Sequence, residues 1–153
     1  MAEKFIVDVH LGKLARLLRL LGFDTFYENN VTINDLLRLS TDQDRIILSR
    51  NKLFSKKSNK SFLVIDENPS IQLKQLYDHF HLKDQIHPFS RCIVCNGTLE
   101  AVSKEDISVL LEKNTSQYFN EFWQCKHCKR IYWKGTHYEN MLKKIQNITG
   151  GPV

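Results

Sequence analysis

Two pairs of cysteines constrain this chain more than any other feature of its sequence. Cys92 and Cys95 form the first pair and Cys125 and Cys128 the second, with 29 residues between the pairs and no further cysteine in the chain. Each pair can place two thiolates on one tight turn, and two such turns make a closed tetrahedral site that suits a structural Zn²⁺. A zinc held by four thiolates has no open position for a substrate, so we expect catalysis elsewhere.

Length and composition favour one ordinary domain, or a compact domain together with a small metal-dependent one. The chain has 153 residues, of which 42% are hydrophobic and 25% charged, proportions typical of soluble globular proteins. The sequence shows no secretory signal and no run of about 18 to 20 apolar residues that could cross a bilayer. We therefore expect a cytoplasmic protein without membrane association, a setting in which paired cysteines bind metal more often than they form disulfides.

The charge of the chain is compatible with nucleic-acid binding but does not require it. The formal net charge is +5, with 13 Lys/Arg against 11 Asp/Glu in residues 1–87 and 9 against 6 in residues 88–153. A modest excess of basic residues in both parts fits a phosphate-binding surface without demanding one.

The sequence predicts two domains, residues 1–87 and residues 88–153. In the first, apolar strands alternate with amphipathic helices, which favours an α/β fold with a small parallel sheet flanked by helices. Strands are expected at residues 4–9, 24–27, 45–49 and 61–65, and helices at residues 11–21, after a cap at Thr32, and at residues 70–80. Between the third and fourth strands we expect a mobile, polar, basic loop.

The second domain is predicted to be a zinc ribbon with an insert. Strands are expected at residues 98–102 and 121–124, a helix between them at residues 103–112, and a final helix at residues 137–148. The second pair is Cys-x-x-Cys rather than two histidines, which excludes a zinc finger of the Cys₂His₂ type.

Acidic and amide side chains follow three of the predicted strands. Asp8 lies near the carboxyl end of the first predicted strand, Asn51 follows the third and Asp66 the fourth, while Asp35 lies at the start of a helix. Ligands of open parallel sheets bind outside the carboxyl ends of the strands, and converging carboxylates repel one another unless a cation lies among them. Oxygen ligands favour Mg²⁺ or Mn²⁺, which can activate water against a phosphodiester. The alternative is that Asp8 and Asp35 cap helices and Asp66 belongs to a turn.

Several segments resemble the PIN-like ribonuclease family named for the C-terminal region of the Mut-seven exonuclease. The resemblance is carried by Asp8, by Asp35, and by the segments LGKLARLLRLLGFDT (11–25), ILSRN (47–51), SRCIVCNGTLE (90–100) and FWQCKHCKRIYWKGTHY (122–138). It covers nearly the whole chain in the right order. It implies a PIN-like α/β domain followed by a four-cysteine zinc ribbon, and metal-dependent ribonuclease activity.

The resemblance also assigns residues. Asp8 matches the first-strand acid that binds metal in PIN-type nucleases, and Asp35 matches the acid at the start of the second helix. The family's usual Thr-Arg-Asp after the third strand is Ser49-Arg50-Asn51 here. Asparagine lacks the charge that holds a hard cation and cannot act as a base, so Asp66 is a candidate for a compensating acid. The alternative is a catalytically weakened RNA-binding or protein-interaction module.

Basic residues near these acids are candidates for holding RNA. We predict phosphate contacts for Lys13, Arg16, Arg50 and Lys52. Arg16 and Arg19 share a helix face and either hold phosphates or form its solvated side. Aromatic residues of the last segment, among them Tyr138, either stack on bases or pack the ribbon against the first domain. The sequence leaves open the RNA, a protein partner and the oligomeric state.

Overall fold

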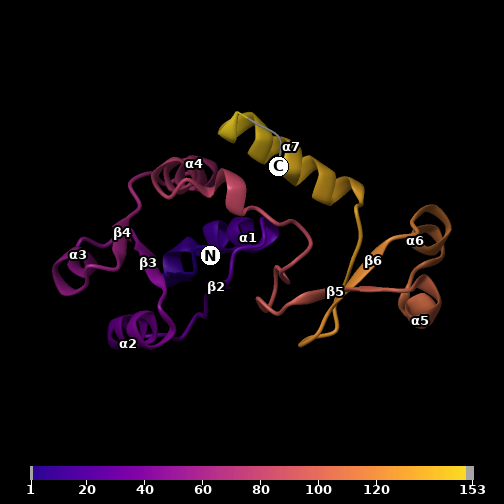
Figure 1. The fold of residues 1–153 in the computed structure, drawn as a ribbon, viewed down its shortest axis with the longest axis horizontal. Coiled ribbons are helices and arrows are strands. Elements are labelled where there is room, and N and C mark those ends of the chain that lie inside the picture. Colours follow the sequence, from indigo (N-terminus) through magenta and orange to yellow (C-terminus); the bar gives the residue numbers. More distant parts are fainter. Residues whose placement is uncertain (1, 151–153) are drawn as a thin grey trace.

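The computed structural model describes residues 2–150, which contain two sheets with their helices (Figure 1). The first part of the chain contains, in order, β1 (Phe5–Val7), η1 (Val9–Leu11), α1 (Gly12–Leu20), β2 (Thr25–Phe26), α2 (Ile33–Gln43), β3 (Ile46–Ser49), α3 (Leu53–Lys57), β4 (Ser61–Leu63), α4 (Pro69–His79) and η2 (Leu82–Gln85). The second part contains β5 (Leu99–Val102), α5 (Lys104–Ile107), η3 (Ser108–Leu110), α6 (Lys113–Tyr118), β6 (Phe122–Cys125), β7 (Ile131–Tyr132) and α7 (Thr136–Thr149).

The first sheet is parallel throughout and has the strand order β2-β1-β3-β4. Ile6 pairs with Phe26 on one side and with Ile47 on the other, and Leu48 pairs with Phe62. The chain therefore turns from β1 to one neighbour and then returns to the opposite side, which places a topological switch point between β1 and β3. The predicted α/β fold with a parallel sheet flanked by helices is confirmed.

Alternating strand residues supply the two faces of this sheet. Phe5, Val7 and Leu48 belong to a buried cluster that includes Leu14, Leu18, Leu73 and Leu76 of α1 and α4. Ile6 and Ile47 face the opposite way and pack with Leu36 of α2 and Phe54 of α3. Because successive side chains of a strand point to opposite faces, these short strands are buried on both sides, as parallel strands usually are.

Side-chain caps fix the starts of two helices, and the cap at Thr32 was predicted from the sequence. Thr32 accepts a hydrogen bond from the Asp35 N–H at 3.1 Å, and the Asp35 carboxylate accepts one from the Thr32 N–H at 3.0 Å. This reciprocal pair is a capping box and fixes the first turn of α2. Asn68 caps α4 through the Ser70 N–H at 2.9 Å, with Pro69 at the first helical position.

The prediction of a loop throughout residues 50–61 is wrong, because α3 lies within that segment. Phe54 is only 2% exposed and packs with Ile6, Leu36 and Ile47. The burial of this ring stabilises one helical turn in a segment whose other residues are polar. Lys56 and Lys57 lie in the last turn of α3, where positive charge is favourable.

The second sheet is antiparallel with the order β5-β6-β7. The predicted single helix over residues 103–112 is corrected to α5 followed by the 3-10 turn η3, and α6 was not predicted. Ile107 is the one buried residue of α5 and η3, whereas Val109 is 91% and Leu110 64% exposed. Without a continuous apolar face, packing does not stabilise one long helix here.

Helix α7 follows the second sheet in the chain but packs on the first part of the molecule. Figure 1 shows it beside α4 and above α1. Tyr138 and Ile145 are buried in the same cluster as Phe5 and Leu14, so Tyr138 packs rather than stacks on bases. The boundary between residues 87 and 88 stays a prediction, and residues 151–153 of the second predicted domain lie outside the described residues.

Candidate functional site

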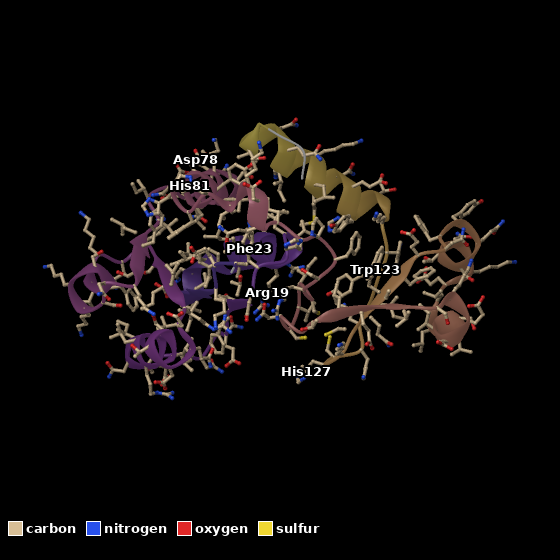
Figure 2. The ribbon with its side chains drawn as sticks, in the orientation of Figure 1. Arg19, Phe23, Asp78, His81, Trp123 and His127 are labelled. Carbon is tan, nitrogen blue, oxygen red and sulfur yellow. The ribbon has the colours of Figure 1, made fainter. Side chains whose placement is uncertain are left out.

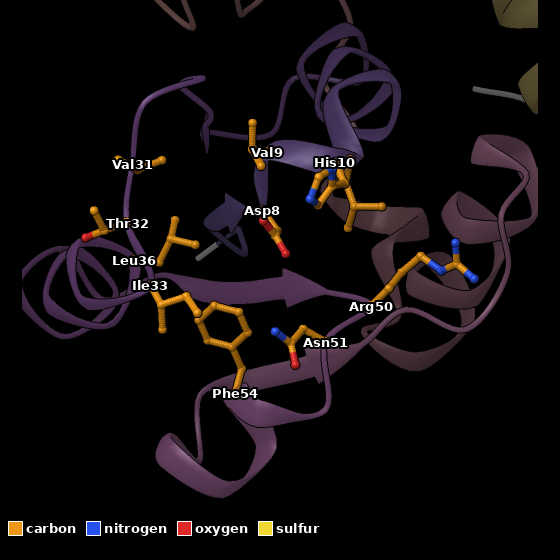
Figure 3. A pocket seen from close by; sticks show the side chains of 11 residues that line it. Asp8, Val9, His10, Val31, Thr32, Ile33, Leu36, Arg50, Asn51 and Phe54 are labelled. Atoms are coloured by element: carbon orange, nitrogen blue, oxygen red, sulfur yellow. The ribbon is translucent and has the colours of Figure 1, made fainter.

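A pocket of about 530 Å³ opens where β1 and β3 end, at the switch point of the sheet (Figure 3). The residues that follow these strands supply its polar wall, which contains Asp8, His10, Arg50 and Asn51. Ile33, Leu36 and Phe54 of α2 and α3 form an apolar wall. The topology therefore gathers residues that lie more than 40 positions apart in the sequence, as Asp8 and Asn51 do.

The Asp8 side chain is held by its neighbours in a fixed orientation. Its backbone N–H donates to the Leu48 carbonyl at 3.0 Å, which continues the pairing of β1 with β3. The Ser49 hydroxyl donates to Oδ2 of Asp8 at 2.8 Å and accepts from the Asn51 N–H at 2.9 Å. Oδ1 of Asp8 has no hydrogen-bond partner among residues 2–150, so one carboxylate oxygen is available to a ligand.

Asn51 lies opposite Asp8 in the pocket, and its amide oxygen is already engaged (Figure 3). Oδ1 of Asn51 accepts a hydrogen bond from the Leu53 N–H at 2.9 Å, at the start of α3. An aspartate would make the same hydrogen bond and add a negative charge to the pocket. With asparagine, Asp8 is the one carboxylate among the residues that line this pocket.

The four cysteines form a compact cluster beside the second sheet. Their Sγ atoms all lie within 4.8 Å of one another. The Sγ atoms of Cys92 and Cys128 are 3.7 Å apart, and those of Cys95 and Cys125 are 3.4 Å apart. Two sulfurs at 2.3 Å from a tetrahedral zinc would be about 3.8 Å apart. The donor set and its spacing fit Zn²⁺.

The two cysteine turns have matching backbone geometry. The Cys92 N–H donates to the Gly97 carbonyl at 2.8 Å, and the Cys125 N–H donates to the Arg130 carbonyl at 2.9 Å. The residue after each pair, Asn96 or Lys129, has a φ of 68°. Gly97 leaves room for the opposite turn, because a Cβ there would lie 2.6 Å from the Sγ of Cys125. Each turn thus presents two sulfurs on one side.

Electrostatics inside the cluster also favour a cation. Burial raises the pKa of Cys95 to about 12, and the surrounding sulfurs add to the shift. Burial also acts to raise the pKa of Cys125, but N–H donors of Cys128 and His127 outweigh it and lower that pKa to about 7. Four adjacent thiolates repel one another, whereas a divalent cation stabilises all of them at once.

Residues 3–145 match the family model of the Mut7-C RNAse domain. The chain belongs to the Mut7-C RNAse family. The match spans both sheets and most of α7, so the Asp8 pocket and the cysteine cluster both lie within it. Neither the curated proteins nor the solved structures contained a match to the chain. No helix of residues 2–150 has the length and the apolar character required to cross a membrane.

Two acids expected at the Mut7-C site do not line the pocket. The hydrogen bond from the Thr32 N–H lowers the pKa of Asp35, whose carboxylate also lies 3.5 Å from Arg38. Asp66 accepts from the Asn68 N–H at 2.7 Å, in the turn before α4. Among residues 2–150, the cysteines are the one group of three or more His, Cys, Asp or Glu ligand atoms within 4.8 Å. Catalytic roles for Asp35 and Asp66 remain predictions.

Of the basic residues expected to hold RNA, Arg50 lies in the pocket lining and Lys52 follows the lining residue Asn51. Arg50 lies 3.9 Å from Glu67, and Lys52 is exposed just before α3. His10, which the sequence analysis did not single out, also lines the pocket. The 3-10 turn that follows Asp8 places residue 10 at the same edge of the sheet as Asp8. The sequence signal that could have identified His10 was therefore its position two residues after Asp8.

Both interpretations of Arg19, as a phosphate ligand and as part of a solvated face, are wrong. Arg19 is 5% exposed, and Figure 2 shows it between the first sheet and the cysteine turns. The guanidinium donates to the Thr25 carbonyl at 2.9 Å and to the Ile93 and Val94 carbonyls at 3.1 Å. Burial lowers its pKa, which the charges of Cys92 and Cys95 oppose. Arg19 thus joins α1 to the first cysteine turn.

Proposed function

We propose that this Mut7-C protein hydrolyses RNA phosphodiester bonds at the Asp8 pocket with the help of Mg²⁺ or Mn²⁺. The observation that carries the proposal is the oriented Asp8 carboxylate, which has one available oxygen, in a pocket at the switch point of a ribonuclease-family sheet. Ser49 restrains Asp8 so that little conformational entropy is lost when a ligand binds.

The residues present fit a divalent cation that shares its ligands with the substrate. Magnesium is commonly held by one or two carboxylates together with substrate phosphates and water. Asp8 would hold it directly, and Asn51 would offer a neutral amide oxygen if its hydrogen bond to Leu53 opened. Such a cation supplies a hydroxide at neutral pH and stabilises negative charge on the phosphate.

The chain's own side chains would bind and orient the RNA. Arg50 can donate two hydrogen bonds to a phosphate, and Lys52 adds positive charge at the rim. His10 offers a further donor to a phosphate oxygen. The apolar wall that contains Phe54 offers a surface to a base. Together they would hold the scissile phosphate beside Asp8.

Asp35 and Asp66 would contribute only as outer ligands, because neither lines the pocket and each uses one carboxylate oxygen to hold a backbone N–H. We therefore expect Asp35→Asn and Asp66→Asn to lower the cleavage rate less than Asp8→Asn does.

The cysteine cluster would hold a structural zinc that keeps the second sheet folded. A closed four-thiolate site binds no substrate, so the zinc would act through packing and through the position of α7. Zinc binding requires reduced thiols, which a cytoplasmic setting maintains.

The alternative function is RNA binding without efficient cleavage, and Asn51 is the observation that favours it. Its amide adds no charge to the pocket and its oxygen already accepts from Leu53. A protein-interaction role would instead be supported by an absence of RNA affinity.

The test is cleavage of labelled single-stranded and structured RNA with Mg²⁺ or Mn²⁺. We expect Asp8→Asn to lower the cleavage rate by about 100-fold or more, as loss of one group that stabilises the transition state does. Asp42→Asn removes an exposed acid of α2 and serves as the matched control. Cleavage that survives Asp8→Asn would rule out this site.

Asn51→Asp separates the two functions. We expect it to raise the cleavage rate and to lower the Mn²⁺ concentration that is required, because it adds a second carboxylate to the pocket. If cleavage occurs only in Asn51→Asp, Asn51 disables the natural enzyme, and RNA binding by the natural chain would then identify the RNA-binding module of the alternative.

A further inference from the structure

Two smaller hollows extend the Asp8 pocket along α1 as far as α7. A hollow of about 370 Å³ shares His10 and Leu11 with the pocket. A second hollow of about 320 Å³ shares Lys13 and Pro69 with the first. Neighbouring hollows share lining residues, so the three lie in a row along α1, and we call this row the α1 groove.

The far end of the α1 groove is lined by cations and by no acid. Lys13 and Arg16 of α1 lie on one side, and Lys144 of α7 lies on the other. None of these three has an acidic partner within 4.0 Å among residues 2–150. Their charges are therefore available to an anionic ligand, without the cost of breaking an existing ion pair.

The middle of the groove contains one acid, and that acid is paired. Glu67 lines this hollow together with Lys13. Its side chain is 87% exposed and lies 3.9 Å from Arg50. An exposed carboxylate can turn into solvent, so it leaves the positive potential between the pocket and Lys144 largely intact.

The floor of the far hollow is apolar and firmly supported. Leu17, Met141 and Ile145 form it. Ile145 is 1% exposed and anchors α7 in the core of the first part of the molecule. Lys144, the residue before it, is therefore held near Arg16 by a packed helix rather than by a loop. Asn68 and Ser70, at the start of α4, add polar groups to the rim.

We propose that the α1 groove binds the single-stranded RNA segment that adjoins the scissile phosphate. Cationic walls that can follow a phosphate backbone and an apolar floor for base faces are the features by which proteins bind single strands. The proposal rests on the proposed function for the chemistry at Asp8, while binding in the groove does not depend on cleavage. Binding of RNA in the α1 groove would make α7 part of the RNA-binding surface.

Lys143 and Lys144 provide a matched pair of variants for the test. Both belong to α7 and carry the same charge, but Lys143 is exposed and lines none of the three hollows. Binding would be measured by fluorescence anisotropy in the Asp8→Asn background, so that the RNA stays intact. The ligands would be a dinucleotide, a longer single strand and a duplex of the same length.

We expect Lys144→Gln to weaken binding of the longer single strand by about three- to fivefold, as loss of one exposed charge pair does. The slope of log affinity against log salt should fall by about 0.7. Arg16→Gln should act in the same way, Lys143→Gln should change neither quantity, and dinucleotide binding should be unaffected by all three. Thermal unfolding would verify that each variant is folded.

RNA binding in the α1 groove would be refuted if Lys144→Gln and Lys143→Gln lowered the affinity equally. It would also be refuted if the affinities for single strand and duplex fell by the same factor. The proposed function is tested separately, by cleavage of the dinucleotide with otherwise unchanged protein. If cleavage depends on Asp8 but RNA affinity does not depend on Lys144, the groove proposal is refuted and the nuclease proposal stands. Binding that depends on Lys144, without cleavage by the natural chain, refutes the nuclease proposal alone.

Discussion

The cysteine cluster and the Asp8 pocket are assembled in different ways. The cluster takes its four ligands from two short turns with matching hydrogen bonds, and all four sulfurs lie within 4.8 Å of one another. The pocket collects residues 8 to 54 through the order of strands in a sheet, and one carboxylate lines it. The proposed structural zinc site thus contains its whole ligand set, whereas the proposed substrate site leaves ligand positions open.

The two regions also differ in how they are attached to the rest of the molecule. Asn96, in the first cysteine turn, accepts from the Thr25 N–H at 2.9 Å and donates to Asp24 at 2.7 Å. Asp24 in turn pairs with Arg45 at 2.8 Å. The cysteine turn is thus joined to the start of β2 by polar contacts, while the pocket is bordered by exposed residues such as Arg50 and Asn51. Substitutions in the cluster should therefore also destabilise the first sheet, whereas substitutions in the pocket should leave the rest of the fold unchanged.

The largest expected effect is that of breaking the cluster with Cys125→Ser. Zinc binding contributes about 10 kcal/mol or more to the folding of small zinc modules, so we expect loss of bound zinc and unfolding of the second sheet. Zinc content and the fluorescence of Trp123 measure both. His127→Ala is the control, since its side chain is exposed between Cys125 and Cys128. Full zinc content in Cys125→Ser would refute four-cysteine coordination.

Arg19→Met should have the next largest effect, because it breaks the attachment between α1 and the cysteine turn. Removing this buried guanidinium leaves three carbonyls without their donor, and we expect a loss of about 3 kcal/mol in unfolding free energy. Arg16→Met, one turn earlier and exposed, should change stability by about 0.5 kcal/mol or less. Urea unfolding of the two variants gives the comparison, and similar losses would contradict the role of Arg19.

Acid should weaken the same attachment through Asp24. Burial acts to raise the pKa of Asp24, but hydrogen bonds from Arg45 and Asn96 outweigh it, so the pKa lies below its ordinary value of 3.8. A lowered carboxyl pKa contributes stability above the unfolded-state pKa, and this stability is lost as the pH falls through the folded-state value. Asp24→Asn should therefore show a weaker loss of stability between about pH 5 and pH 2 than the unchanged chain. An unchanged pH profile in urea unfolding would contradict this, with exposed Asp78→Asn as the control.

The smallest expected effect concerns the capping box beside the pocket. Thr32→Ala should lower stability by about 1 kcal/mol through loss of the cap, while the Asp35 carboxylate stays in place. If Asp35 takes part in cleavage, Asp35→Asn should lower the cleavage rate more than Thr32→Ala does. Equal cleavage rates in the two variants would indicate that Asp35 only caps α2 and takes no part in cleavage. Thermal unfolding and cleavage of one RNA substrate provide the two measurements.

Features encoded within a few residues could be predicted from the sequence. The cysteine spacing predicted the cluster, the Thr32–Asp35 pattern predicted the capping box, and alternating apolar segments predicted the parallel sheet. The partners of Arg19 could not be predicted, because the Ile93 and Val94 carbonyls lie 74 and 75 residues away in the chain. Helix α3 was missed for a similar reason, since it depends on packing of Phe54 against three other elements.

The candidate site was predictable in position but not in composition. Placing Asp8 and Asn51 together requires only the rule that ligands bind at strand ends. Which further acids reach the pocket depends on side-chain hydrogen bonds, and those of Asp35 and Asp66 are made with nearby N–H groups. His10 was overlooked because its position two residues after Asp8 gains meaning only from the 3-10 turn that follows β1.

The packing of α7 on the first sheet has a consequence for synthesis of the chain. Tyr138 and Ile145 complete a core whose other members are mostly in the first 82 residues. A nascent chain therefore exposes the apolar surface of α1 and α4 until α7 has left the ribosome, and the first sheet completes its packing only after the cysteine turns have been made. Zinc and folding factors that act on the emerging chain would meet it before its first core is closed.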